Sequence, residues 1–152
     1  MDELAQKFRA VQWTYADKDP GARAELTRRI ADAGGRLGLI TYSDLVRGVT
    51  FHLPNIRNGE AYTISVYDWT GLDRRIIGEF LGYISMESWE EGGFLASALV
   101  VNKQEYKPSD IFFEWMRQLG VLPDLREDTV LAFWADQVNK GHNWYRSRRR
   151  AV

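Results

Sequence analysis

The chain has 152 residues, a formal net charge of −1, no cysteine and 6 tryptophans, and 45% of its residues are hydrophobic. This length suits one folded domain, and so apolar a composition excludes an intrinsically disordered chain. The absence of cysteine excludes disulfides, thiolate zinc sites and a cysteine nucleophile, and the near-neutral charge means that any attraction to nucleic acid must come from local patches.

Two helices are predicted at the start of the chain. Apolar residues recur at helical spacing over residues 2 to 16, and a second stripe covers residues 20 to 35, with proline at its first position and two glycines at its end. A short extended segment, residues 37 to 40, leads to Thr41, whose hydroxyl can cap a short helix that Gly48 closes.

A hairpin and a long helix are predicted next. Residues 61 to 67 alternate as a strand does, and pairing with residues 49 to 53 would form a hairpin. Thr70 and Asp73 have the spacing of a helix-capping pair. The broad apolar stripe after them predicts a helix that ends at the glycines at positions 92 and 93.

The run from residue 94 to residue 101 is almost wholly apolar. Its length, its β-branched end and the glycines before it predict a buried strand. Asn102 and Lys103 follow, and we interpret them as the end of this strand in solvent. Two more helices are predicted, an aromatic one over residues 108 to 120 and a last one from about residue 127 through residue 145.

Together these elements predict an α+β fold. We expect a mostly helical single domain over residues 1 to 146, with a small antiparallel sheet in which residues 94 to 101 form the central strand. A basic C-terminal tail, residues 147 to 152, would follow it and fray. No apolar run approaches the ~20 residues of a membrane span, so we expect a cytoplasmic protein with no membrane partner.

Familiar catalytic and cofactor-binding motifs are missing from the sequence. There is no HExxH, no EF-hand loop, no P-loop, no GxGxxG and no GxSxG, and His52 and His142 lie far apart. The acid-x-Lys triplet of restriction-type nucleases is incomplete here, because Val101 occupies the position of the carboxylate residue two before Lys103. We therefore predict no catalytic residue, no metal site and no cofactor, which disfavours an enzyme, although distant residues can still converge on a site.

Basic side chains are concentrated around the second helix, after the short helix and at the C-terminus. If they gather on one face they would contact phosphates, with the helix opened by Thr41 lying against a duplex. The alternative is a solvated surface with ion pairs one turn apart, for which Glu25 and Arg29 have the right spacing. The residues predicted to bind nucleic acid, DNA or RNA, are Arg28, Arg29, Arg36, Thr41, Tyr42, Ser43, Arg47, Arg146, Arg148, Arg149 and Arg150.

A protein–protein interaction module is the alternative function. Tryptophans at the ends of elements are typical of interface hot spots, and a cluster of acids suits a basic partner. Such a module would be an immunity protein, an antitoxin or an anti-defence inhibitor. The residues predicted for this partner surface are Trp69, Glu87, Trp89, Glu90, Glu91 and Trp144.

The blocks LITYSDLV, FLGYIS, SALVVNK, PSDIFFEW and FWADQVNKGHNWY resemble those of a group of small bacterial and phage-borne proteins found near restriction and other defence genes. The resemblance covers most of residues 24 to 146. It implies a role linked to phage or mobile-element defence, and it assigns no catalytic residue.

A more distant likeness is to the winged helix-turn-helix DNA-binding domain of alkyltransferases. Residues 41 to 43 are similar to the TYG-type turn that opens a helix in that domain. The Pro-Cys-His-Arg block of the family has no counterpart, since residues 98 to 101 are Ala-Leu-Val-Val. The likeness therefore implies a winged-helix-like, DNA-binding shape and excludes alkyl transfer.

Overall fold

The computed structural model describes residues 2 to 150, with the side chain of Arg150 outside the described part. This part is mostly helical with short strands, which confirms the predicted α+β class, and none of its helices is long and apolar enough to cross a membrane. The helices are α1 (Glu3–Arg9), α2 (Pro20–Gly35), α3 (Tyr42–Val46), α4 (Gly71–Gly92), α5 (Asp110–Gln118) and α6 (Glu127–Arg150). The strands are β1 (Ile40–Thr41), β2 (Phe51–His52), β3 (Ala61–Tyr62) and β4 (Val100–Val101), and the 3₁₀ turns are η1 (Arg57–Gly59) and η2 (Ala96–Leu99).

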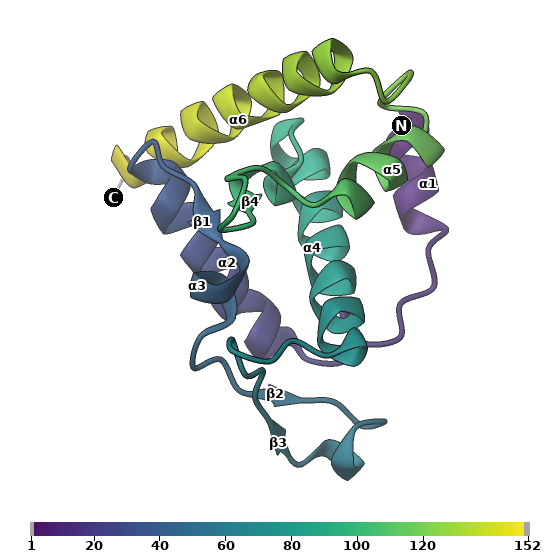
Figure 1. Cartoon of the computed structure of the whole chain (residues 1–152), viewed down its shortest axis with the longest axis vertical. Helices are drawn as coiled ribbons and strands as arrows, with labels where there is room; N and C mark the ends of the chain where they lie inside the picture. Colours follow the sequence, from purple (N-terminus) through teal and green to yellow (C-terminus); the bar gives the residue numbers. More distant parts are fainter. Residues whose placement is uncertain (1, 151–152) are drawn as a thin grey trace.

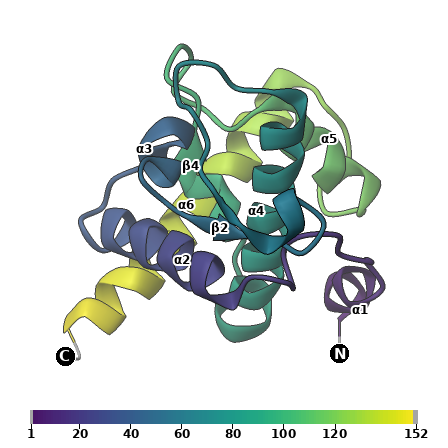
Figure 2. The same cartoon turned by 90° about the horizontal axis from the view of Figure 1, so that it is seen from below.

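Helix α4 stands at the centre of the molecule, with α1 and α2 on opposite sides of it (Figures 1 and 2). Helix α6 crosses one end, and the β2–β3 hairpin lies at the other (Figure 1). One core cluster joins α2, α4 and the hairpin through the fully buried side chains of Leu26, Phe80 and Phe51. A second cluster, around Phe8 and Met116, holds α1 and α5 to α6.

Helices α2 and α6 pack closely at Gly34. A Cβ at this position would lie 2.5 Å from Cδ2 of Tyr145, closer than side-chain atoms can approach, so the contact requires glycine. Helix α6 continues without a break to Arg150, so residues 147 to 150 of the predicted tail are helical.

Two pairs of short strands are present in the described chain. Strands β2 and β3 pair antiparallel, with Phe51 opposite Tyr62, which confirms the predicted hairpin. The predicted strand over residues 61 to 67 is too long, because β3 ends at Tyr62. Strands β1 and β4 pair parallel, with Ile40 opposite Val100, whereas an antiparallel sheet was predicted. Because parallel strands run in the same direction, the residues that follow β1 and β4 emerge at one edge.

The prediction of a strand over residues 94 to 101 is wrong for most of its length, since only its last two residues form β4 and four others form η2. The segment is buried, as predicted, but helices α4 and α6 provide its hydrogen-bond acceptors. Its backbone N–H groups donate from Leu95 to Gln137 (2.8 Å), from Ala96 to Ser88 (2.9 Å) and from Ser97 to Ser85 (3.0 Å). These side-chain acceptors take the place of the backbone carbonyls that a neighbouring strand would provide.

Helix α1 ends at Arg9, so it is shorter than the helix predicted over residues 2 to 16. Further along, Glu79 on α4 accepts hydrogen bonds from the backbone N–H groups of Tyr15 (2.7 Å) and Ala16 (3.2 Å). This carboxylate holds the segment against α4 in a non-helical conformation. Such a tertiary contact overrides local helix propensity.

The predicted helix caps are confirmed at Thr41 and Thr70. The Thr41 hydroxyl accepts a hydrogen bond from the N–H of Asp44 (3.1 Å). Thr70 and Asp73 form a full capping box, each side chain accepting the N–H of the other residue at 3.0 Å. Asp73 also accepts a hydrogen bond from the Tyr62 hydroxyl, which ties the hairpin to the start of α4.

Candidate functional site

A cavity of about 1030 Å³ lies beside the edge at which β1 and β4 end. Tyr42 follows β1, Asn102 and Lys103 follow β4, and all three line this central cavity. Asn102 and Lys103 follow the end of β4, as predicted; Lys103 is exposed and Asn102 half-buried, and both also border the cavity. The parallel pairing of the two strands brings these residues together.

Aromatic rings from five segments line the central cavity. They come from the segment after α1, from α3, from the segment before α4, from the loop after β4 and from α5. Two of the rings stand at the mouth, where Tyr67 is 91% exposed and Tyr106 is 53% exposed. The tyrosine and tryptophan rings that line the cavity are Trp13, Tyr42, Tyr67, Trp69, Tyr106 and Trp115.

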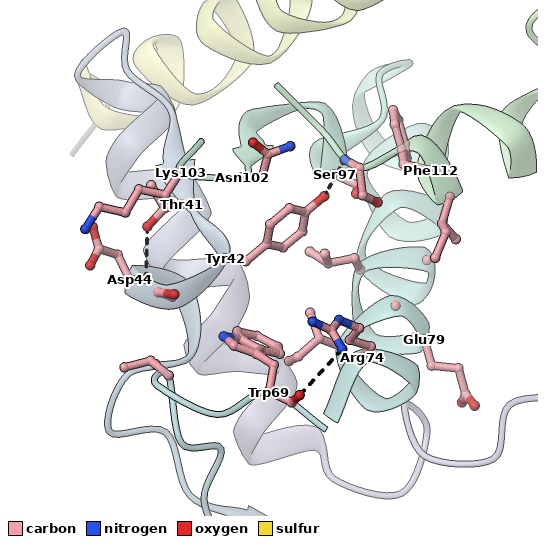
Figure 3. Close-up of a pocket in the computed structure, with 18 of the residues that line it drawn as sticks. Thr41, Tyr42, Asp44, Trp69, Arg74, Glu79, Ser97, Asn102, Lys103 and Phe112 are labelled. Atoms are coloured by element: carbon pink, nitrogen blue, oxygen red, sulfur yellow. Dashed lines mark hydrogen bonds between the residues drawn. The ribbon is translucent and has the colours of Figure 1, made fainter. Parts of the chain in front are cut away.

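The Tyr42 ring extends from α3 across the cavity toward the side on which Ser97 and Phe112 lie (Figure 3). Its hydroxyl oxygen accepts a hydrogen bond from the backbone N–H of Ser109 at 3.0 Å. This bond links α3 to the start of α5 across the cavity. Within the described residues the hydroxyl donates no hydrogen bond, so its proton is available to a ligand.

Asn102 shapes the loop that carries Lys103 and Tyr106. Its side-chain Oδ1 accepts from the N–H of Glu105 (2.6 Å), and its carbonyl accepts from the N–H of Tyr106 (3.0 Å). Its own N–H donates to the carbonyl of Lys107 (2.9 Å). The loop is thus a closed turn that presents a cation and a ring to the cavity.

The charge available in the central cavity is positive. Within residues 2 to 150, neither Arg74 nor Lys103 forms an ion pair, and both line the cavity. Asp44 is 3.4 Å from the guanidinium of Arg47. Glu79 lies to one side of the cavity (Figure 3), and its Oε1 is occupied by backbone N–H groups. An anion would therefore meet two cations without acidic partners.

Four of the eight arginines predicted to contact phosphates have polar partners within the described part of the protein: Arg28, Arg29, Arg36 and Arg47. Arg28 forms two bonds with Glu25, at 2.7 and 2.9 Å, and these bonds, aided by Arg29, lower the pKa of Glu25 to about 2. Arg36 pairs with Asp32 at 3.3 Å. Around α2, these basic residues therefore form ion pairs with acids three or four residues away, which is the alternative of a solvated surface.

Arg29 has a structural role. Its Nη1 donates to three carbonyls at the end of α3, those of Asp44 (3.2 Å), Leu45 (3.1 Å) and Arg47 (2.7 Å). These are carbonyls that a helix end leaves without intrahelical donors. Arg29 therefore holds α3 against α2 and remains only partly exposed.

Arg146, Arg148 and Arg149, near the end of α6, are exposed and form no ion pair within the described residues. The Arg148 guanidinium stacks on the Trp144 ring, and the Arg149 side chain packs beside Gly35 at the end of α2. Arg146 is exposed, and the side chain of Arg150 lies outside the described part. Arg146, Arg148 and Arg149 do not line the central cavity, whereas Thr41, Tyr42, Ser43 and Arg47 from the same predicted set do.

Of the residues predicted to contact a protein partner, some are available and others hold elements of the fold together. Trp69 lines the central cavity and Glu91 is exposed, while the others hold elements together. Trp89 donates its indole N–H to Asp2 at 3.1 Å, and the Trp144 ring packs on Phe94. Glu90 forms an ion pair with Arg9 at 2.8 Å. Glu87 forms one with Arg23 at 3.7 Å, and its partial burial raises its pKa.

Sequence reasoning missed Tyr67, Arg74 and Tyr106 as site residues. Tyr67 and Tyr106 lie in loops, and the only signal for them is their position beside Trp69 and Lys103 in the sequence. Arg74 lies outside the apolar stripe of its helix, on the face that the sequence predicts to be in solvent. The fold alone brings the three to one opening.

These side chains form a candidate binding site, with rings to stack on, cations to hold an anion, and the amide of Gln104 to form hydrogen bonds. Among residues 2 to 150, no three histidine, aspartate or glutamate side chains cluster as they would around a metal ion. No protein-family model, curated protein or solved structure matches the chain.

Proposed function

We propose that the protein is a non-enzymatic binding protein that holds a short unpaired segment of DNA or RNA in the central cavity. The observation that carries the proposal is the pair of exposed rings, Tyr67 and Tyr106, at the mouth of a cavity lined with further rings. Stacking of one base on an aromatic side chain contributes about 1–3 kcal/mol and tolerates any sequence.

Two cations that have no acidic partner among the described residues, Arg74 and Lys103, support a nucleic acid as the ligand. Arg74 and Lys103 come from different elements and both border the cavity, so phosphates on either side of a stacked base can reach a positive charge. Each phosphate contact releases a counterion, which makes binding weaker as salt rises. An apolar peptide would gain nothing from these two groups.

The cavity favours unpaired nucleotides over a duplex. Helix α3 has only 5 residues, and Thr41, Tyr42 and Ser43 face the cavity, so they are not presented as a recognition helix is. Recessed rings accept bases that are free of their complementary strand. The sequence resemblance to defence-associated proteins supports a role in phage or mobile-element defence in the cytoplasm.

The test is fluorescence anisotropy with a labelled single strand about ten nucleotides long, as DNA and as RNA, against a duplex of the same sequence. We expect the single strand to bind more tightly, with a slope of log K against log salt of about −1.4 for two phosphate contacts. Arg74→Ala should reduce the slope to about −0.7. Arg75→Ala is the matched control, because Arg75 is the exposed neighbour that does not line the cavity, and it should leave the slope unchanged.

Two outcomes would contradict the proposal. One is the absence of binding to any single strand at low salt. The other is equal loss of binding in the Arg74 and Arg75 variants, which would indicate diffuse surface charge. Stoichiometric binding of a folded protein partner in place of the oligonucleotide would instead support the protein–protein alternative.

A further inference from the structure

The described fold does not explain why residue 78 is a glycine. It lies inside α4, where glycine is less favourable than alanine because it loses more backbone entropy on folding. Its φ is not positive, and a Cβ added at this position would meet no atom within 4 Å. Neither backbone conformation nor packing within the described chain therefore requires a glycine here.

Gly82, one turn further along α4, is a contrasting case. A Cβ there would lie 2.7 Å from Cη2 of Trp115 and 3.3 Å from Cη2 of Trp13. The ends of these two indole rings rest on the helix backbone at Gly82. Packing within the chain thus accounts for this glycine.

Arg74, Gly78 and Gly82 lie four residues apart and so form one row along α4. All three line the central cavity. In this row a cation stands at one end and two indole rings at the other, and the backbone at Gly78 between them is bare and exposed.

We propose that Gly78 is a specificity-determining position, kept free of a side chain so that a ring of the ligand can lie directly on α4. The inference rests on the proposed function, and the ring is then a nucleobase. Its plane contacts the helix at Gly78, its edge meets the indoles over Gly82, and its phosphate reaches Arg74. A methyl group at position 78 would occupy the place of the base.

The test compares Gly78→Ala with the wild type in thermal unfolding and in binding of the labelled single strand. Because alanine is the better helix former and meets no neighbour, we expect the variant to unfold about 2–4 °C higher. Its affinity for the oligonucleotide should fall about tenfold, as expected when an extra methyl group enters a packed contact. Gly71→Ala is the matched control, since Gly71 is also exposed on α4 without neighbours but does not line the cavity, and it should bind as the wild type does.

The outcomes separate this inference from the proposed function. If the wild type binds the single strand and Gly78→Ala binds it equally well, the inference is overturned and the proposed function stands. If Gly78→Ala is less stable than the wild type, the fold needs the glycine, which also overturns the inference. If the wild type binds no single strand, it is the proposed function that fails.

Discussion

Replacing Asp73 by alanine is expected to lower the free energy of unfolding by about 3 kcal/mol. Asp73 is 2% exposed and accepts hydrogen bonds from the Thr70 N–H and the Tyr62 hydroxyl. Burial, reinforced by the bond to Asp73, raises the pKa of Tyr62, so its hydroxyl stays protonated and donates at neutral pH. The variant would leave both donors without an acceptor and would remove half of the capping box.

Equilibrium unfolding in urea measures this effect, with Tyr62→Phe and Thr70→Ala as partial controls. Tyr62→Phe removes one bond to the carboxylate and Thr70→Ala removes the other half of the cap, so each should cost about 1–2 kcal/mol. The double variant Tyr62→Phe/Asp73→Ala should cost less than the sum of the two single changes, because both break the same bond. A change below about 0.5 kcal/mol for Asp73→Ala would be typical of an ordinary surface site and would contradict the prediction.

The double variant Tyr67→Ala/Tyr106→Ala is expected to weaken binding of a single strand about 100-fold. Each ring would lose the stacking energy of one base. Both rings are largely exposed, so removing them should change the free energy of unfolding by less than about 0.5 kcal/mol. Anisotropy titration and urea unfolding of the same preparations measure the two quantities.

Two control variants separate stacking from other effects. Tyr67→Phe/Tyr106→Phe keeps both rings and loses only the hydroxyls, so it should bind nearly as the wild type does. Leu125→Ala/Leu131→Ala removes two side chains, each 47% exposed, that do not line the cavity, and it should also leave binding unchanged. Wild-type affinity in the double alanine variant would show that the tyrosines at the mouth do not contact the ligand.

The ends of several elements could be predicted from the sequence because capping is a short-range interaction. The Thr41 hydroxyl reaches the N–H three residues on, and so does that of Thr70. The turn at Gly93 has a φ of 72°, a conformation that glycine adopts without strain, and the sequence predicted the helix end there. The ion pair of Glu25 with Arg29 also follows from spacing on one helix.

The interior of residues 94 to 101 could not be predicted in the same way. An apolar run indicates burial, and the segment is buried. Whether its N–H groups bond to a strand or to side chains depends on residues far away in the sequence, here Gln137, Ser85 and Ser88. The same run therefore suits a strand and a 3₁₀ turn equally well until its neighbours are placed.

By itself, the sequence determined the fold class, most helix limits, the β2–β3 hairpin and the mainly apolar character of the core, because these depend on periodicity and on contacts a few residues apart. Only the tertiary structure decided which polar side chains remain available. It assigns Arg29 to backbone carbonyls at the end of α3, and by pairing β1 parallel to β4 it brings Lys103 to the cavity. The physical reason is that charge and hydrogen-bonding capacity are used up by contacts between residues distant in sequence, and folding alone selects those contacts.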